Sequence, residues 1–192
     1  KAIAVTFDGK AVSADNPVAA QMSDFTSWGV TPSLDFKPEI TAPGGKIYST
    51  LNDNEYGVMS GTSMAAPHVA GGTALVMQRI AKDFKVDGAT RVKLAKNILM
   101  NTSRPQLDQG KYNAQLKTGN FYSPRREGAG LMDLRAAMKT PVVVTETKSG
   151  EGKASLKEVG EKFTFTLDLK NYSSEKVTYK LAGTVQSDLG AE

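Results

Sequence analysis

The sequence predicts a chain that combines α-helices with β-strands. Apolar residues recur at helical spacing along residues 63–84 and again along 90–101. After residue 140 the period of the apolar residues changes to two, which is typical of strands with one buried face. A chain of 192 residues has room for one or two domains. The change of period therefore predicts a boundary between residues 1–140 and 141–192.

The N-terminal part is expected to begin with a strand and to continue in loops. Three apolar residues alternate along residues 1–7: Ile3, Val5 and Phe7. Residues 9–16 are expected to form a loop. Residues 21–29 are polar with two aromatic side chains, and we expect Trp28 to lie in the core or in the wall of a cleft. Proline and glycine interrupt residues 37–45, which predicts an irregular backbone.

One long helix is expected over residues 63–84. The residues at helical spacing are Val69, Thr73, Val76, Met77, Ile80 and Phe84. The first half of this helix carries alanine and glycine on nearly all of its faces, which predicts close packing on every side. Gly71 and Gly72 each cost about 1 kcal/mol relative to Ala, and tight contact between the helix and a sheet would explain them. Pro67 is expected in the first turn, where its missing N–H costs little.

A second, amphipathic helix is expected over residues 90–101, and Pro105 follows its end. Its expected apolar face consists of Val92, Ala95, Ile98 and Leu99. Residues 104–118 are expected to form a loop. Asp133 is then placed to cap a short helix over 134–139.

Two alternating runs near the C-terminus predict an antiparallel hairpin with one buried face. The first run is Phe163, Phe165, Leu167 and Leu169, and the second is Val177, Tyr179 and Leu181. The polar residues 171–174 form the expected turn between them. A complete β-sandwich of the immunoglobulin-like kind needs about 100 residues. Residues 141–192 are therefore expected to be only the first strands of one.

Residues 61–71, with the sequence GTSMAAPHVAG, place Ser63 between a flexible segment and the start of an apolar helix. A serine hydroxyl is a poor nucleophile unless the protein holds it, removes its proton and stabilises the oxyanion that forms. A helix N-terminus favours such negative charge through its free backbone N–H groups and its dipole. Gly61 has no Cβ and lets the backbone approach a substrate closely.

The alternative role for Ser63 is that of a helix N-cap without chemistry. A serine before an apolar helix is, taken alone, more often a cap than a nucleophile. The complete string of residues 61–71 reverses this preference, because it constrains many positions at once.

This string resembles the nucleophile motif of subtilisin-like serine peptidases nearly letter for letter. FTSWG at 25–29 and KPEITAPG at 37–44 resemble the FTSxG and KPDITAPG segments that lead into that motif, with Glu39 in place of the commoner Asp. SPRREGAGLMD at 123–133 resembles the SPRRQGAGLVD segment of lactocepin-type enzymes. With Trp28, these segments resemble the large Gram-positive cell-envelope subtilases of the lactocepin and C5a-peptidase type.

The resemblance implies an α/β fold. Residues 1–140 would be the C-terminal portion of a parallel-sheet catalytic domain, and 141–192 the start of a fibronectin-III-like β-sandwich. It implies a secreted or wall-bound serine endopeptidase that acts on proteins or peptides. Ser63 would attack the scissile carbonyl, and its backbone N–H would donate to the oxyanion, with Thr62 and Gly61 as auxiliary residues. Calcium is common in the family, but the sequence contains no visible acidic ligand cluster, and we expect no cofactor.

The rest of the catalytic machinery is expected upstream of residue 1. The triad of subtilisin-like enzymes runs Asp, His, Ser along the chain, and their oxyanion asparagine also precedes the serine. The only histidine, His68, follows Ser63 on the same helix and does not lie over the helix N-terminus. The resemblance gives it a structural role. Asp133 also follows Ser63 and is no candidate for the triad, so we expect the isolated chain to be inactive.

Composition excludes several other functions. The chain has no cysteine, which excludes disulfides, thiolate catalysis and cysteine metal sites. Its net charge of +4 is spread along the chain without a basic stripe, so no nucleic-acid partner is expected. No apolar run reaches membrane-spanning length, so no membrane partner is expected. Arg125 and Arg126 are a candidate substrate-binding pair, although an ion pair or loop anchor is the favoured interpretation.

A second hypothesis belongs to a different class of protein: a non-catalytic binding or scaffolding module derived from a peptidase shell. The complete motif argues against it, because a shell without catalysis has no chemical need for the Ser63 hydroxyl. The missing Asp and His would favour it only if this chain were the whole gene product.

Overall fold

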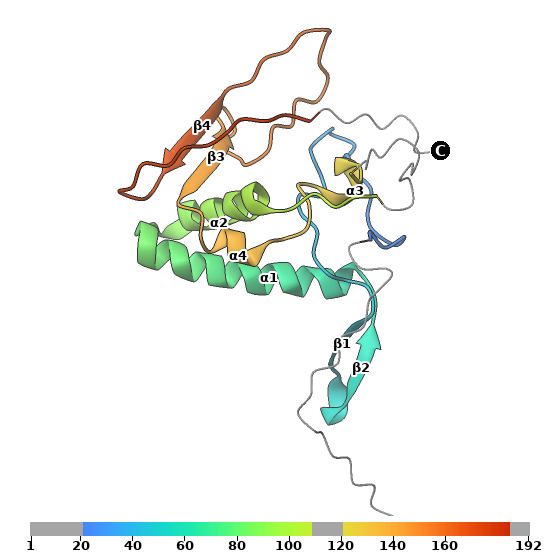
Figure 1. Cartoon of the computed structure of the whole chain (residues 1–192). Coiled ribbons are helices and arrows are strands. Elements are labelled where there is room, and N and C mark those ends of the chain that lie inside the picture. The colour runs from blue at the N-terminus through green and yellow to red at the C-terminus, as the bar shows by residue number, and fades with distance from the viewer. Residues whose placement is uncertain (1–20, 109–120, 185–192) are drawn as a thin grey trace, which may run out of the picture.

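The computed structural model of the chain describes residues 21–108 and 121–184 (Figure 1). The predicted strand over 1–7, the predicted loop over 9–16 and part of the predicted loop over 104–118 lie outside these residues. The elements in chain order are β1 (Ile47–Thr50), β2 (Tyr56–Met59), α1 (Thr62–Arg79), α2 (Gly88–Thr102), α3 (Pro124–Glu127), α4 (Leu134–Ala137), β3 (Val142–Glu146) and β4 (Leu167–Asn171). None of the helices in the described part of the chain combines the length and the apolar character needed to span a membrane.

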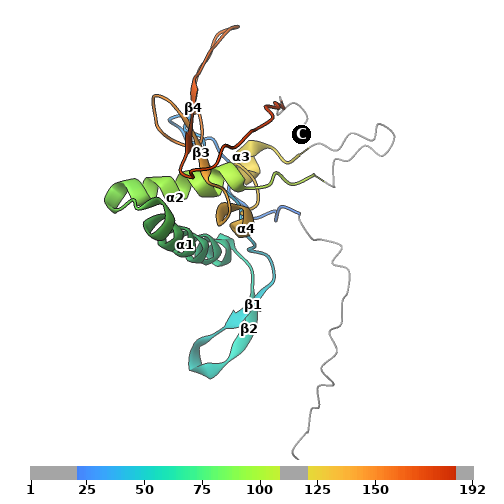
Figure 2. The same cartoon turned by 60° about the vertical axis from the view of Figure 1, so that its left-hand side comes forward.

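Helices α1 and α2 lie side by side, and α4 and β3 pack against them (Figures 1 and 2). The buried core between these elements consists of Val76, Ile80, Leu94, Ala95, Ile98, Leu99, Ala137 and Val143. Each fully buried Ile or Leu side chain contributes about 1.5–3 kcal/mol relative to an exposed one. Val143 belongs to this core although it follows the expected boundary at residue 140. The division into residues 1–140 and 141–192 stays a prediction.

Both long helices are confirmed. α1 continues through a π-helical turn, Ile80–Phe84, and the helical path ends at Lys85, whose φ of 56° is left-handed. Arg79 then ties α1 to the end of α4, because its guanidinium donates to the carbonyls of Ala137 and Thr140, both at 2.7 Å. α2 buries Ala95, Ile98 and Leu99 as expected, whereas Val92 is exposed.

The expectation of close packing around the first half of α1 is wrong for the described residues. Gly72 is the first buried residue of this helix, and a Cβ there would lie 2.8 Å from Met132 Sδ. Its neighbours are thus Met132 and Leu134 rather than a sheet. Gly71 has nothing within 4 Å of an added Cβ, because only one side of α1 has neighbours in the described residues.

Pro67 lies in the second turn of α1 and not in the first, because the helix begins at Thr62. An i→i−4 bond from position 67 would end on the carbonyl of Ser63, and proline has no N–H to make it. The carbonyl of Ser63 is therefore left without its usual helical donor.

The predicted hairpin near the C-terminus is wrong in its pairing. β4 pairs antiparallel with β3, from Val142 opposite Asn171 to Glu146 opposite Leu167, and residues 177–181 form no strand. All residues of β4 are exposed, so the expected buried face is absent from the described residues. The turn itself is present, since the Ser173 N–H donates to Asn171 Oδ1 at 3.0 Å.

The class of mixed helices and strands agrees with an α/β fold. Within the described residues the two strand pairs, β1–β2 and β3–β4, are antiparallel, and one parallel bridge joins Thr41 to Leu131. The expected cap of α4 is confirmed, because Asp133 Oδ1 accepts from the Ala136 N–H at 2.9 Å.

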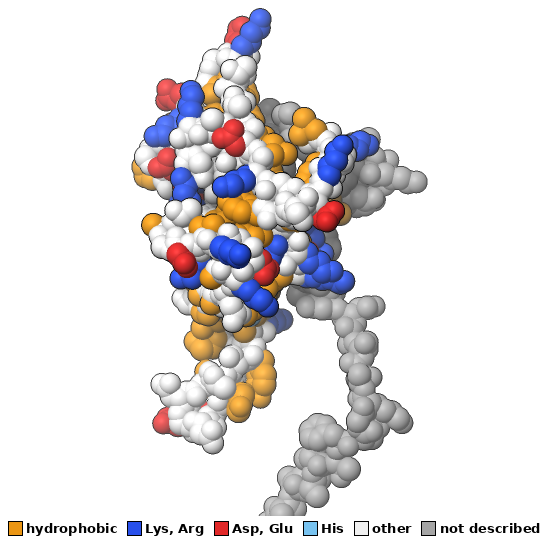
Figure 3. Space-filling view, turned by 90° about the vertical axis from the view of Figure 1, so that its left-hand side faces the viewer, with side chains coloured by type: hydrophobic (Ala, Val, Ile, Leu, Met, Phe, Trp, Pro, Cys, Tyr) orange, Lys and Arg blue, Asp and Glu red, His pale blue; other side chains and the backbone are white. Residues whose placement is uncertain are grey.

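The β1–β2 hairpin projects away from the helices in both ribbon views (Figures 1 and 2). Its apolar side chains are visible on the lower projection of the space-filling view (Figure 3). The exposed ones are Tyr48, Tyr56, Val58 and Met59. Tyr48 and Tyr56 stack with their ring centroids 5.8 Å apart. β2 ends three residues before Thr62, so the hairpin leads directly into α1.

Candidate active site

Ser63 is the second residue of α1, and its side chain is exposed. The helix N-cap is Gly61, whose φ of 158° and ψ of 161° fall in a region that is essentially open to glycine alone. The Gly61 carbonyl accepts from the N–H groups of Met64 and Ala65, at 3.0 and 3.3 Å. In the described part of the chain no hydrogen bond uses the N–H of Thr62 or Ser63. Two backbone donors therefore remain free beside the hydroxyl.

A neighbouring segment fixes the backbone that carries Ser63. The Gly61 N–H donates to the Gly44 carbonyl at 2.8 Å, and the Lys46 N–H donates to Ser60 Oγ at 2.8 Å. A Cβ on Gly44 would lie 2.8 Å from the Gly61 carbonyl oxygen and 3.1 Å from Ala65 Cβ. Only glycine at position 44 permits this close approach to the first turn of α1.

His68 does not face Ser63 as a base would. Its Nδ1 lies 2.9 Å from the carbonyl oxygen of Met64, one turn earlier on the same helix. A carbonyl only accepts, so Nδ1 carries the proton and donates. This agrees with a structural role for His68. The side chain of His68 is exposed in the described part of the chain.

Arg125 and Arg126 anchor the loop around α3 to residues 21–29. Arg125 Nε donates to the Gly29 carbonyl at 2.7 Å, and the Gly29 N–H donates back to the Arg125 carbonyl at 2.8 Å. Arg126 lies over the rings of Trp28 and Tyr122, at 5.2 and 5.4 Å from their centroids. The interpretation as a loop anchor is confirmed. Trp28 is 51% exposed and is therefore not part of the core.

Glu127 is a titratable residue that the sequence analysis missed. Its side chain is buried in the same loop, and the Gln106 N–H donates to Oε2 at 3.0 Å. Burial outweighs this hydrogen bond and raises the pKa of Glu127 to about 7. Glu at a position where the lactocepin-type segment has Gln was the only signal for it.

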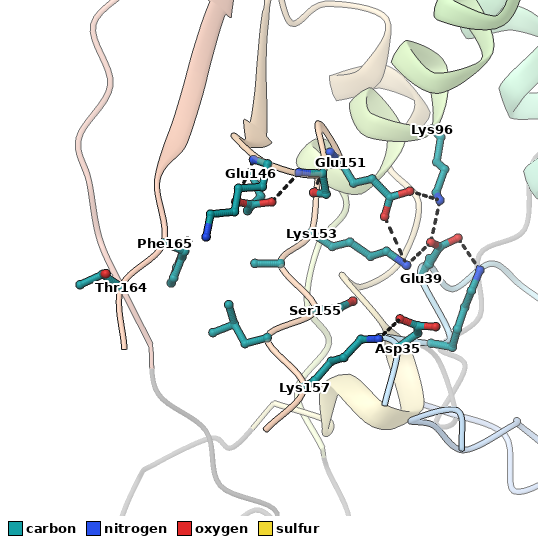
Figure 4. A pocket seen from close by; sticks show the side chains of 15 residues that line it. Asp35, Glu39, Lys96, Glu146, Glu151, Lys153, Ser155, Lys157, Thr164 and Phe165 are labelled. Carbon is teal, nitrogen blue, oxygen red and sulfur yellow. Dashed lines mark hydrogen bonds and ion pairs between the residues drawn. The ribbon is translucent and has the colours of Figure 1, made fainter. Parts of the chain in front are cut away.

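A group of charged side chains surrounds Glu39 (Figure 4). Burial alone would raise the pKa of Glu39, but hydrogen bonds from Lys153, Lys96 and Lys37 outweigh it and lower the pKa to about 2. The group lines a pocket of about 740 Å³ between residues 35–39, α2 and the segment after β3. In the sequence, Glu39 differs from the resembled segment only by standing in place of Asp.

The described residues contain no group of three or more His, Asp or Glu side chains placed to hold a metal ion.

The predicted site residues Gly61, Thr62 and Ser63 lie together at the N-terminus of α1. Chemically, this arrangement offers a hydroxyl beside free N–H donors that can stabilise an oxyanion. A base to accept the hydroxyl proton is not among the described neighbours of Ser63.

Comparisons with known proteins match this chain to one family of peptidases. The model of the subtilase family of peptidases matches residues 10–130. The chain is 40% identical over 174 residues to a PII-type proteinase of Lacticaseibacillus paracasei, which covers 84% of this chain. It is 31% identical over 185 residues to a C5a peptidase of Streptococcus pyogenes, which covers 96% of it. A solved structure of the patellamide maturation protease PatA matches 52% of the chain at 25% identity, with a TM-score of 0.38.

The relatives are much longer than this chain. It spans 9% of the length of the PII-type proteinase and 15% of that of the C5a peptidase. The match with PatA covers 32% of the PatA chain.

Proposed function

Because the chain belongs to the subtilase family, we propose that it carries the nucleophile, Ser63, of a serine endopeptidase. The observation that carries this proposal is the geometry at the start of α1. An exposed serine hydroxyl lies beside the free N–H groups of Thr62 and Ser63, on a backbone held by Gly44. An N-cap serine without chemistry would instead use its own oxygen to accept from such N–H groups.

In the proposed reaction Ser63 Oγ attacks the carbonyl carbon of the scissile peptide bond. Its proton passes to a general base, and the carbonyl oxygen becomes an oxyanion that the Ser63 N–H stabilises, with Thr62 as an auxiliary donor. The base returns the proton to the leaving amine, and water then hydrolyses the acyl-enzyme. His68 is not that base, because it lies five residues after Ser63 on the same helix and therefore does not lie over the helix N-terminus.

We propose that the base, its orienting carboxylate and the oxyanion asparagine come from the rest of the catalytic domain. The side of α1 without described neighbours supports this proposal. Its exposed small and apolar residues are Ala66, Ala70, Gly71, Ala74 and Leu75. They offer a face on which further secondary structure can pack closely, and Ser63 lies at the end of this face. The exposed strand β4 similarly supports a fibronectin-III-like β-sandwich that extends beyond the described residues.

We propose protein or peptide substrates and an extracellular or wall-bound location, by analogy with the proteinases that the chain resembles. The proposed chemistry needs no cofactor. Calcium binding by the complete domain is compatible with it, but none of the described residues are assigned to a calcium site.

A fluorophosphonate probe tests the proposed function directly, because it phosphonylates only an activated serine. We expect the complete enzyme to be labelled once per molecule, and peptide mapping to place the label on Ser63. Labelling elsewhere would contradict the assignment. No labelling of an intact and folded complete protein would favour the alternative, a binding or scaffolding module derived from a peptidase shell.

A further inference from the structure

We propose that Glu39 is a positioning residue for Ser63. Through its ion pairs with Glu39, the segment after β3 (residues 147–157) holds the backbone of Ser63 in the position that the reaction needs. This inference rests on the proposed function of Ser63 and concerns residues outside the nucleophile motif. Three ammonium groups from three parts of the chain meet on one carboxylate (Figure 4). They connect the segment that leads to Ser63 with residues beyond the expected domain boundary.

The contacts at Glu39 are dense. Lys96 Nζ of α2 lies 2.8 Å from Oε1, Lys153 Nζ pairs with the same oxygen, and Lys37 Nζ lies 2.9 Å from Oε2. Glu151 shares Lys96 at 3.2 Å and Lys153 at 3.7 Å. The side chain of Glu39 is only 16% exposed and that of Lys153 only 11%, so these charges are screened less than a surface pair.

The segment after β3 is itself held firmly on both sides. Asn97 of α2 accepts from the Gly152 N–H at 2.9 Å and donates to the Gly150 carbonyl at 3.0 Å. Lys153 Nζ also donates to the Phe36 carbonyl at 3.0 Å, and the Phe36 N–H donates to Ser155 Oγ at 3.0 Å. Lys153 therefore presents its charge to Glu39 from a fixed backbone.

From Glu39 a short, bonded stretch of chain leads to the nucleophile. The Glu39 carbonyl accepts from the Ala129 N–H at 3.0 Å, and Thr41 forms a parallel bridge with Leu131. Three residues after Thr41, Gly44 accepts from the Gly61 N–H at 2.8 Å. A shift at Glu39 is thereby transmitted to Gly61, two residues from Ser63. Misplacement of a reacting group by about 1 Å can cost about 100-fold in rate.

A side-chain length argument favours Glu over the commoner Asp at this position. Asp would carry the same charge one methylene closer to the backbone. Its carboxylate would therefore lie farther from the ammonium group of Lys153. Glu39 is thus suited to reach a lysine that lies after β3, and the pairing links the two parts of the chain at this point.

The test uses the complete enzyme and the variants Glu39→Gln, Glu39→Asp, Lys153→Met and Glu39→Gln/Lys153→Met. Lys157→Met is the matched control, because Lys157 lines the same pocket but pairs with Asp35 at 4.0 Å and not with Glu39. For each protein kcat, KM, the rate of phosphonylation by a fluorophosphonate and Tm are measured, with kinetics recorded well below the lowest Tm. Ser63→Ala is assayed in parallel.

We expect Glu39→Gln and Lys153→Met each to lower kcat and the phosphonylation rate by about tenfold or more, with KM changed less than about twofold. The double variant should be no slower than Glu39→Gln, because the two residues act as one unit. Glu39→Asp should restore part of the loss, and Lys157→Met should match the wild type. If Glu39→Gln fails to fold, Lys153→Met and Glu39→Asp still decide the outcome.

A lowered Tm with kcat unchanged would show that Glu39 only stabilises the fold, and would overturn the inference. Independent losses that multiply in the double variant would overturn it as well, since they exclude coupling through this pair. Turnover retained by Ser63→Ala would instead overturn the proposed function, and that result is read separately from the Glu39 series.

Discussion

At the scale of single residues, the buried carboxyl group of Glu127 makes the stability of the fold depend on pH. Burial raises its pKa from 4.5 to about 7. Between these pH values the folded chain keeps a proton that the unfolded chain has lost. The free energy of unfolding therefore falls as pH rises through this window, and the effect levels off above pH 7.

Replacing Glu127 by Gln should remove this dependence. The amide keeps an oxygen to accept from the Gln106 N–H and carries no charge to bury. Above pH 7 we expect Glu127→Gln to raise the free energy of unfolding of the complete protein by up to about 3 kcal/mol, and near pH 4.5 by little. Urea unfolding of both proteins at several pH values between 4.5 and 8 measures the difference. A difference that does not change with pH would contradict the assignment.

His68 is expected to matter to α1 and not to proton transfer. His68→Ala removes the bond from Nδ1 to the Met64 carbonyl, but alanine favours the helix more than histidine does. The change in stability of the complete enzyme should therefore be within about 1 kcal/mol at an exposed site. The neutral-pH limb of the rate profile should persist. Loss of the neutral-pH limb of the rate profile in His68→Ala, with Tm unchanged, would show that His68 takes part in catalysis.

At the scale of elements, the two glycines of α1 separate its covered side from its open side. Gly72 contacts Met132, whereas Gly71 has open space around it. If the rest of the catalytic domain packs closely on the open side, Gly71→Ala should lower the Tm of the complete enzyme. On an exposed helix the same change would raise stability by about 1 kcal/mol. A thermal melt distinguishes the two, and a raised Tm would contradict close packing at Gly71.

The elements that the sequence predicted well are those set by local chemistry. α1, α2 and the Asp133 cap follow from apolar spacing and side-chain-to-backbone bonds within a few residues. Strand partners depend on distant residues, so alternation identified β4 but not its pairing with β3. The alternation also predicted a strand at 177–181, where the structure has none.

In the candidate site, too, the features set by neighbouring residues could be predicted from the sequence, and those set by distant segments could not. The N-terminal placement of Ser63 could be predicted, because the motif and the helix start are adjacent in sequence. Glu39 and Lys153 are 114 residues apart in the chain, and no local pattern connects them. The burial of Glu127 likewise depends on the approach of Gln106 from another segment.

At the scale of the whole molecule, the chain is expected to need the rest of its catalytic domain for activity. Ser63 has no base among its described neighbours, and His68 lies five residues further along the same helix. The isolated chain should therefore neither hydrolyse peptides nor react with a fluorophosphonate probe under conditions in which the complete enzyme reacts fully. Intact-mass measurement checks this, and stoichiometric labelling of the isolated chain would refute it.

The most direct test of the central claim is the turnover of Ser63→Ala in the complete enzyme. In subtilisin, loss of the nucleophile costs about 10⁶ in kcat, and the shared motif leads us to expect a loss on the same scale. Ser60→Ala is the matched control: Ser60 accepts from the Lys46 N–H near the same helix start but lies outside α1, and its variant should keep a measurable rate. With Tm nearly unchanged, Ser63→Ala should abolish both peptide hydrolysis and acylation. If it keeps more than a few per cent of wild-type turnover, the nucleophile lies elsewhere and Ser63 does not have the proposed role.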